Sequence, residues 1–185
     1  MPNLPRWDLP RQRLRTGRQV SNYAQGTLAR MMEVARAEVG TIEGPKNNQT
    51  KYGAFTQRDF LPWCGSYLMW CAHQAGVTIP DVVSTIDGAN SFRHARTFFD
   101  SPNVGDLVFY AWDNPNVIQH VGLVIRLATN QIVTVEGNTS PSGSQSNGGQ
   151  VMLKSRYTGA HSGIAGYGRP LYKAPSTIPT QGVRQ

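Results

Sequence analysis

Residues 120–138 read HVGLVIRLATNQIVTVEGN, two runs rich in β-branched residues on either side of a short polar turn. Polar and apolar residues alternate in both runs, which is typical of paired strands that bury one face. A register that places His120 opposite Asn138 brings the apolar faces together and leaves 128–130 as a three-residue loop. Asn130 suits such a loop because asparagine tolerates the left-handed conformation. The apolar face then contains Val121, Leu123, Ile125, Leu127, Val133 and Val135.

The polar face of this predicted hairpin gathers groups that suit catalysis. In the same register Glu136 lies opposite Gly122, one diagonal step from His120. His120, Glu136 and Asn138 therefore point the same way, because side chains two residues apart share a face of a sheet. A carboxylate and an amide beside an imidazole can fix its tautomer and stabilise its protonated form. The alternative interpretation is an ordinary polar strand face with a solvated histidine.

The segments on either side of the hairpin fall into helices first and strands later. Apolar spacing predicts a helix over 21–39, ended by Gly40, and a second helix over 64–75, ended by Gly76. A short helix is expected near 88–99, and the polar segments 41–62 and 139–150 are expected to be loops. Further strands are predicted over 107–110, 151–156 and 164–172. This order predicts an α+β fold rather than an alternating α/β fold.

Cys64 opens the second predicted helix, directly after Pro62 and Trp63. A helix N-terminus lowers the pKa of a thiol, and its free N–H groups can stabilise an oxyanion. This position suits a nucleophile, and the alternative is a buried, inert thiol. Cys71 lies in the middle of the helix, where the inert interpretation is favoured. Two turns of helix separate the cysteines too far for a disulfide, so we expect two reduced thiols.

The length of the chain and the distribution of its charge predict one domain with an extension at each end. The chain has 185 residues, of which 39% are hydrophobic, enough for one domain core. The net charge of +7 is concentrated in residues 1–20, where five arginines accompany one aspartate. We therefore expect a basic N-terminal arm (1–20), a body (21–173) and a linker-like C-terminal tail (174–185). The near-neutral body argues against a nucleic-acid-binding fold, and the arm is either a solvated extension or attracted to an anionic surface such as a cell wall.

Hydropathy adds two expectations about location. No apolar run is long enough to cross a bilayer, so we expect no membrane span. The N-terminus has no apolar segment of the kind that a secretory signal peptide contains, so we expect no ordinary signal peptide.

Three stretches resemble the CHAP domain, the cysteine- and histidine-dependent amidohydrolase/peptidase, in the form found in phage endolysins. They are EGP…NN…TKYG within 43–53, PWCGSY…WCA…QAG within 62–76, and GDLVF…HVG…VEGN within 105–138. The resemblance implies a papain-like α+β fold in which N-terminal helices pack on a small antiparallel sheet. It implies cleavage of amide or peptide bonds in peptidoglycan, with Cys64 as nucleophile and His120 as base. The orienting residue of the family falls on Glu136, and Asn138 is a fourth polar member.

Other site residues follow from the same resemblance. Tyr52 is our candidate for a second oxyanion donor beside the Cys64 backbone N–H. Trp63 and Trp112 are candidates to line the substrate groove, although aromatic rings beside a helix start are more often packing. Some CHAP domains bind calcium through an acidic loop before the cysteine. Here that region carries mainly amides, a hydroxyl and a lysine, so we expect no metal and no cofactor.

The resemblance leaves the reaction and the setting open. An endopeptidase and an N-acetylmuramoyl-L-alanine amidase would use the same residues. A monomeric endolysin, made in the host cytoplasm and acting on the bacterial wall at lysis, is the first hypothesis. The alternatives are a virion-associated wall-penetrating lysin and a catalytically silent wall-binding module on the same fold. Because Cys64, His120, Glu136 and Asn138 all occur together, we favour an enzyme over a silent module.

Overall fold

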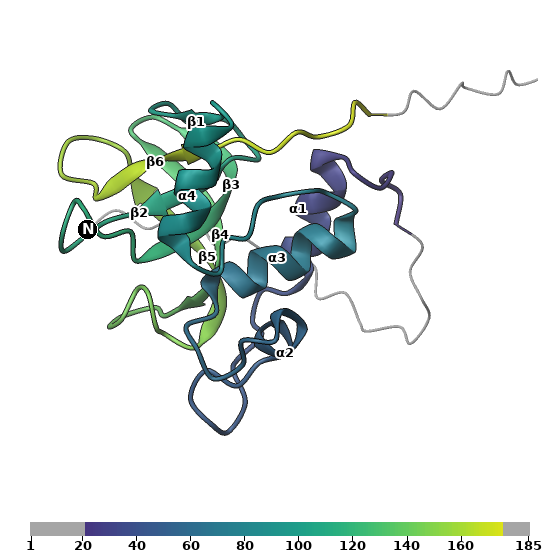
Figure 1. The fold of residues 1–185 in the computed structure, drawn as a ribbon, viewed down its shortest axis with the longest axis vertical. Helices are drawn as coiled ribbons and strands as arrows, with labels where there is room; N and C mark the ends of the chain where they lie inside the picture. The colour runs from purple at the N-terminus through teal and green to yellow at the C-terminus, as the bar shows by residue number, and fades with distance from the viewer. Residues whose placement is uncertain (1–20, 176–185) are drawn as a thin grey trace, which may run out of the picture.

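The computed structural model describes residues 21–175, which form helices on one side and an antiparallel sheet on the other (Figure 1). The predicted arm 1–20 and most of the predicted tail 174–185 lie outside the described residues. The helices are α1 (Leu28–Ala37), α2 (Lys51–Thr56), α3 (Cys64–Ala75) and α4 (Thr85–His94). The strands are β1 (Phe98–Phe99), β2 (Leu107–Tyr110), β3 (His120–Ala128), β4 (Gln131–Thr139), β5 (Gln150–Tyr157) and β6 (Ile164–Gly168), in the sheet order β1-β6-β2-β3-β4-β5.

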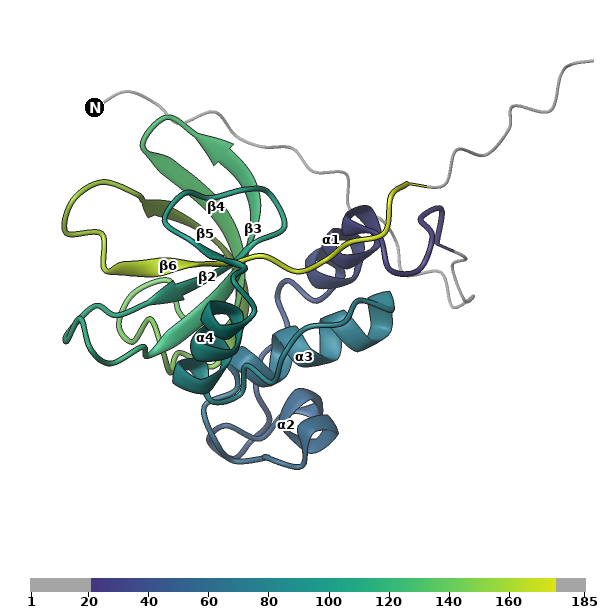
Figure 2. The same cartoon turned by 45° about the horizontal axis from the view of Figure 1, so that its top comes forward.

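Helix α3 is the centre of the helical layer and begins and ends where the sequence predicts. Gly76 ends it in the left-handed conformation (φ 65°), and the N–H of Val77 returns to the carbonyl of Ala72. Figure 2 shows α3 between α1 and α2, with the sheet beside it. Contacts of α3 with β3 and β4 bring its first turn to the strands of the hairpin. The helix therefore carries Cys64 to the middle of the molecule.

Local capping explains where the other helices depart from expectation. Helix α1 begins at Leu28 rather than near Ser21, because Thr27 caps it by accepting from the N–H of Arg30 (3.2 Å). The segment 41–62, predicted to be a loop, contains α2, which Thr50 caps in the same way through Gly53. The expected helix near 88–99 begins earlier, at Thr85, and 98–99 instead form β1 against β6.

The β3–β4 hairpin has the predicted register near the site and a different one near its turn. Leu123 pairs with Val135, as predicted. A bulge after Val124 then shifts the pairing by one residue, so the loop has two residues, 129–130, and the predicted three-residue loop is wrong. Asn130 does adopt the left-handed conformation (φ 55°). The shift also turns Leu127 off the predicted apolar face, and its side chain is 44% exposed.

The two faces of the sheet bury different sets of side chains. One face packs on the helices, with Phe109, Val121, Leu123 and Val135 in the same core as α1 and α3. The other face carries a smaller cluster of Val108, Tyr110, Val124, Ile132 and Tyr167, against which Trp112 packs. Helix α3 lies against β3 and β4, so the architecture is an α+β arrangement of helices on an antiparallel sheet. The predicted fold class, N-terminal helices on a small antiparallel sheet, is confirmed.

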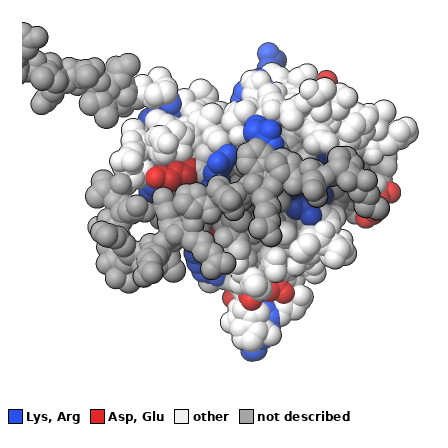
Figure 3. Space-filling view, turned by 180° about the vertical axis from the view of Figure 1, so that it is seen from behind, with Lys and Arg blue, Asp and Glu red and all other residues white. Residues whose placement is uncertain are grey.

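Charged side chains are dispersed over the part of the surface that Figure 3 shows. On the face drawn in Figure 3, the visible lysines and arginines stand apart from one another among uncharged side chains, with acidic groups between them. Within residues 21–175, no helix has the length and apolar character that crossing a membrane requires.

Candidate active site

Cys64 is the first residue of α3, and its thiol is free and buried. Burial raises the pKa of the thiol, but the charge of His120 and the backbone N–H groups of Val121 and Gly65 outweigh burial and lower it. A side chain at Gly65 would meet the carbonyl of Val82 at 2.1 Å, so the chain after the thiol has room only for glycine. The fold thus favours a thiolate at the helix start.

His120 is the first residue of β3 and is fully buried beside that thiol. Its Nε2 lies 3.0 Å from Oε2 of Glu136. Its Nδ1 has no hydrogen-bond partner of standard geometry among residues 21–175, so this is the ring nitrogen left for Cys64. Burial alone would lower the pKa of His120, but the Cys64 thiolate and Glu136 raise it to about 9. Each charge thus favours the other: a protonated His120 lowers the pKa of the thiol, and a thiolate at Cys64 raises the pKa of the imidazole.

Glu136 lies on β4, and its buried carboxylate accepts from every side. Besides His120, its oxygens accept from the hydroxyls of Tyr110 (3.2 Å) and Thr134 (2.5 Å). Arg156 donates to both oxygens, with Nε at 2.9 Å from Oε1 and Nη2 on Oε2. Burial would raise the pKa of Glu136, but Arg156 and His120 hold it well below its usual range. The group that orients the imidazole is thus a carboxylate at neutral pH.

The sequence interpretation missed Tyr110, Thr134 and Arg156. Thr134 lies two residues before Glu136, so the alternation of the strand could have placed it on the same face. Arg156 lies on β5, opposite Ile132, after an irregular connection, and no pattern in the sequence gives that register. Tyr110 pairs with His120 across β2 and β3. Arg156 and Tyr110 therefore reach the site through strand pairing that only the structure reveals.

Trp112 lies at the site, half-buried, as a cover over the imidazole. Its ring stacks on that of His120 (centroids 5.5 Å apart, interplanar angle 27°) and on that of Tyr110 (4.7 Å, 19°). The predicted role of Trp112 in lining a substrate groove stays a prediction.

Trp63 and Tyr52 are placed elsewhere, which corrects the roles expected for them. Trp63 is fully buried and donates from Nε1 to Glu43 (3.1 Å), so its ring does not line a groove. Tyr52 stacks on Trp63 (5.4 Å) and is also fully buried. Its hydroxyl donates to Glu38 (2.5 Å), which leaves no hydroxyl hydrogen for an oxyanion at Cys64. Both rings hold α2 against α3.

Asn138 is buried at the end of β4, but its hydrogen bonds lead away from His120. It adopts the left-handed conformation (φ 57°) at an irregularity between Glu136 and Thr139. Its Oδ1 accepts from the N–H of Gly149 (3.2 Å), and its Nδ2 donates to Asn147 (3.1 Å). The side chain thus anchors the loop 140–149 next to the site, instead of bonding to the imidazole.

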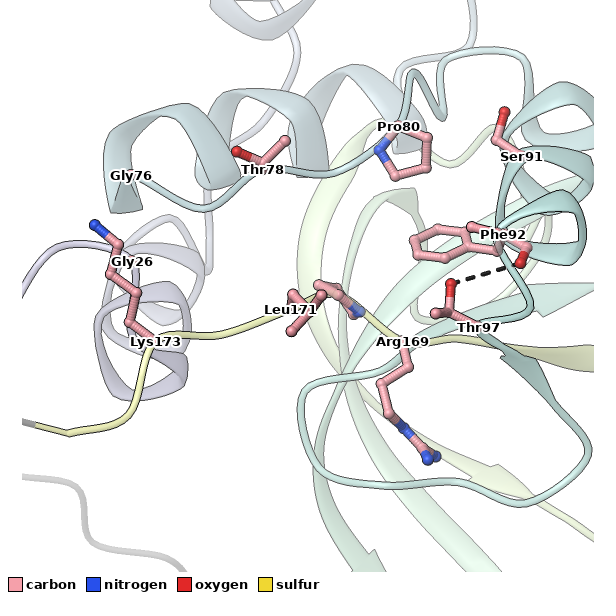
Figure 4. A pocket seen from close by; sticks show the side chains of 12 residues that line it. Gly26, Gly76, Thr78, Pro80, Ser91, Phe92, Thr97, Arg169, Leu171 and Lys173 are labelled. Carbon is pink, nitrogen blue, oxygen red and sulfur yellow. Dashed lines mark hydrogen bonds between the residues drawn. The ribbon is translucent and has the colours of Figure 1, made fainter.

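A cleft of about 380 Å³ reaches Cys64 from the surface. It is lined by Arg58, Leu61, Pro62, Cys64, Val83, Ser84, Thr85 and Gln119. A cavity of about 460 Å³ lies elsewhere, between α4, the end of α3 and residues 169–173 (Figure 4). Its lining, which includes Phe92, Leu171 and Lys173, contains none of the site residues above. Of these two hollows, the cleft is the one that borders the thiol of Cys64.

Within the described part of the chain, no group of three or more His, Cys, Asp or Glu side chains could hold a metal ion. The groups that are available for chemistry at the site belong to the residues around Cys64. These are a buried thiol, an imidazole between that thiol and a carboxylate, and an N–H-rich helix start.

Comparisons with known proteins show which family and which solved structures this chain is similar to. The model of the CHAP domain matches residues 56–138. No curated protein sequence matches the chain. Two solved structures that are similar to it are Ly7917 (17% identity, TM-score 0.47) and a Staphylococcus aureus subsp. aureus Mu50 protein described as similar to a lipoprotein of the NLP/P60 family (14%, 0.43). The matches cover 78% and 85% of this chain but only 62% and 46% of those two chains.

The family match includes the residues on which the site is built. Cys64, His120, Glu136 and Asn138 all fall between residues 56 and 138. The similarity of the chain to the CHAP domain, first indicated by three sequence motifs, is thus confirmed over residues 56–138.

Proposed function

We propose that this protein is a peptidoglycan hydrolase of the endolysin type, which cleaves amide or peptide bonds with Cys64 as nucleophile. The observation that carries this proposal is the buried line from the Cys64 thiol through His120 to Glu136, at the inner end of a cleft. A thiol with a lowered pKa, a base beside it and an oriented imidazole are the parts that thiol-dependent acyl transfer requires. The match to the CHAP domain supports peptidoglycan as the substrate.

In the first half of the reaction, the Cys64 thiolate attacks the carbonyl carbon of the scissile amide, and the carbonyl oxygen takes the negative charge. The backbone N–H of Cys64, at the start of α3, donates to that oxygen. His120 gives a proton to the amide nitrogen, the C–N bond breaks, and the amine leaves. Cys64 then carries the acyl group as a thioester. Glu136 keeps Nε2–H in a hydrogen bond, so that Nδ1 is the nitrogen that handles the proton.

In the second half, His120 takes a proton from water, and the resulting hydroxide attacks the thioester carbon. The C–S bond breaks, the carboxylic acid product leaves and gives its proton to the surrounding water, and Cys64 returns as a thiolate beside the imidazolium. The stacked ring of Trp112 limits water around the imidazole to the side that faces the cleft. Glu136 stabilises the positive charge of the imidazole in both halves.

The setting is part of the same proposal. A free lysin that accumulates in the host cytoplasm and reaches the wall at lysis is favoured, acting as a monomer. The similarity to the two solved structures says nothing about which bond is cleaved, so the choice between amidase and endopeptidase rests on product analysis.

The test compares the wild-type protein with Cys64→Ala on isolated peptidoglycan. We expect wild type to clear the suspension and Cys64→Ala to lose at least about 10³-fold in rate, because a nucleophile cannot be replaced by a methyl group. Cys71→Ala is the matched control, since Cys71 is buried in the middle of the same helix and takes no part in the reaction. Mass spectrometry of the new termini distinguishes cleavage after muramic acid from cleavage within the peptide.

Two outcomes would overturn the proposal. Equal clearing by wild type and Cys64→Ala would mean that the thiol is not the nucleophile. If neither cleared any of several wall types while both sedimented with the walls, a silent wall-binding module would replace the hydrolase. Clearing only by particles that display the protein would favour a virion-associated lysin over a free one.

A further inference from the structure

The guanidinium of Arg156 is fixed by contacts on several sides. It donates to both oxygens of Glu136, and its Nη1 donates to Oε1 of Gln145 (3.0 Å). The side chain is only 13% exposed, although β5 lies at the edge of the sheet. A planar guanidinium with paired donors matches a carboxylate in geometry as well as in charge, which a lysine cannot do. Arg156 therefore fixes the rotation of the Glu136 carboxylate and not only its charge.

The same guanidinium also lies over the two rings that cover the imidazole. Its central carbon is 5.1 Å from the centroid of Trp112 and 5.4 Å from that of Tyr110. Those rings stack on each other and lie against His120. One side chain thus contacts the orienting carboxylate and the aromatic cover, while the cleft at Cys64 is lined by other residues. Arg156 is not among the residues that line that cleft.

We propose that Arg156 is a positioning residue, which acts through Glu136 to hold the imidazole of His120 in its reactive orientation toward Cys64. This inference rests on the proposed thiol mechanism. The loop 140–149 takes part in the same network, because Gln145 of that loop accepts from Arg156 and Asn138 anchors the loop next to it. Among residues 21–175, the titratable or charged groups that interact with Glu136 are His120, Tyr110, Arg156 and Lys154.

Two substitutions separate the charge of Arg156 from its geometry. Arg156→Lys keeps the charge and loses the paired donors, so we expect kcat to fall about 10- to 100-fold with little change in KM, as for other partners of a catalytic group. The acid limb of the pH profile should stay in place. Arg156→Gln also removes the charge, so the acid limb should move to higher pH by about one unit, the effect of a nearby charge. The pKa values of Glu136 and of the thiol both rise when that cation is lost.

A double-mutant comparison tests whether Arg156 acts through Glu136. Adding Arg156→Gln to a Glu136→Gln protein should cost little further activity, because the carboxylate that Arg156 positions is already absent. If the fold-loss of kcat in the double variant equalled the product of the fold-losses in the two single variants, the proposal would be overturned. This pair also addresses folding, since removing both charges leaves no unpaired buried charge, whereas Arg156→Gln alone does.

Arg169→Gln is the matched control for a lost arginine. Arg169 also donates to both oxygens of a buried carboxylate, that of Asp106, through Nε (2.9 Å) and Nη2 (2.8 Å). Its loss should lower the melting temperature and leave the pH profile of kcat in place. If Arg169→Gln and Arg156→Gln changed kcat and the pH profile alike, the role of Arg156 would be merely structural.

A substrate-free readout keeps this proposal distinct from the proposed function. The rate at which iodoacetamide alkylates Cys64, followed by peptide mapping over a range of pH, reports the thiolate directly. We expect Arg156→Gln to shift the midpoint of that curve to higher pH and Arg156→Lys to leave the midpoint unchanged. If wild type cleaves no wall but these shifts occur, the hydrolase proposal fails and the positioning role stands. If walls are cleaved and neither Arg156 variant changes kcat or the alkylation curve, the positioning role fails alone.

Discussion

At the scale of single residues, the site is organised around the carboxylate of Glu136. A buried carboxylate loses its hydration, and five donors replace it: two from Arg156 and one each from His120, Tyr110 and Thr134. Since two of these partners are cationic, the ionised form is favoured in spite of complete burial. An ionised Glu136 in turn raises the pKa of His120, and the imidazolium lowers the pKa of Cys64. The reactive thiolate thus depends on residues that do not touch it.

The corrected position of Tyr52 leads to a prediction at this scale. Tyr52→Phe removes only the hydroxyl that donates to Glu38, and Glu38 keeps its ion pair with Lys51 (2.7 Å). We expect kcat to stay within about two-fold of wild type and the free energy of unfolding to fall by about 1 kcal/mol, the usual net value of a hydrogen bond. Peptidoglycan clearing and urea unfolding measure the two quantities.

The opposite result for Tyr52→Phe would restore its role as an oxyanion donor. Removal of such a donor costs about 10²- to 10³-fold in kcat in enzymes of this kind. A loss of that size with unchanged stability would mean that Tyr52 leaves Glu38 when substrate binds. The pKa of Tyr52 is raised by burial and by Glu38, so the hydroxyl stays protonated in either case.

The sequence predicted the line from Cys64 to Glu136 because each step has a local signal. A cysteine at a helix start and a histidine diagonal to a glutamate on paired strands are visible from spacing. Arg156 was not visible, since its register depends on the irregular connection after Asn138. The hydroxyl of Tyr52 points to Glu38 because of the packing of α2 on α3, and the resemblance to a family contains no such information.

At the scale of elements, the β3–β4 hairpin and helix α3 hold the reacting groups at a fixed separation. Gly122 and Gly137 allow the close approach that this needs. A Cβ at Gly122 would lie 2.7 Å from Cγ of Glu136, and one at Gly137 would lie 2.7 Å from Cβ of Tyr67 on α3. One glycine thus leaves room for the orienting carboxylate, and the other leaves room for the helix that carries the thiol.

These two glycines give a matched pair of substitutions. We expect Gly122→Ala to lower kcat about 10- to 100-fold, because Glu136 is held by five donors and can yield only by losing its alignment with His120. We expect Gly137→Ala to act mainly on stability, by about 1–3 kcal/mol, the cost of overpacking a core. Thermal melts and clearing rates of both variants provide the measurement. Equal effects of both on kcat, after correction for the folded fraction, would contradict this division.

Helices and strands were predicted well where the apolar pattern is long. They were predicted poorly where a helix cap or a β-bulge sets the boundary or the register. Helix α3 has an apolar pattern of three turns and a terminal glycine, and its bounds were predicted correctly. Helix α2 has only six residues and depends on the Thr50 cap and on packing against α3. The bulge after Val124 inserts one residue into β3, and alternation alone cannot show such an insertion.

At the scale of the whole molecule, the order of helices and strands along the chain was enough to predict the α+β class. The order of the strands within the sheet could not be predicted in the same way. Strand β6 lies between β1 and β2, so the last strand in sequence closes the sheet next to the first two. This pairing joins segments about 60 residues apart, and its register depends on tertiary contacts such as the Arg169–Asp106 pair. The same long-range pairing holds β2, the strand whose Tyr110 donates to Glu136.

The ionised network should leave its mark on how the stability of the whole protein depends on pH. Glu136 has a pKa far below its unfolded value, so it contributes stability that is present above about pH 4.5 and is lost as the pH falls. His120 has a raised pKa, so its contribution is present below about pH 6.5 and is lost as the pH rises through about 9. The lowered pKa of Cys64 works in the opposite sense on that alkaline side, because a depressed acid gains stability as the pH rises. The contributions of His120 and Cys64 therefore oppose each other on the alkaline side, and the acid side should be the steeper of the two.

Glu136→Gln tests this expectation. Urea unfolding of wild type and Glu136→Gln should be compared as slopes of unfolding free energy against pH, since the variant also leaves Arg156 unpaired. Below about pH 4.5 the wild-type slope should exceed that of the variant by up to about 1.4 kcal/mol per pH unit, the value for one proton. Asp81→Asn serves as the control, because Asp81 pairs with Arg58 in water and its contribution is screened. Parallel acid slopes for wild type and Glu136→Gln would mean that Glu136 is not ionised in the folded protein, and the imidazole would then lack the charge that the thiol mechanism requires.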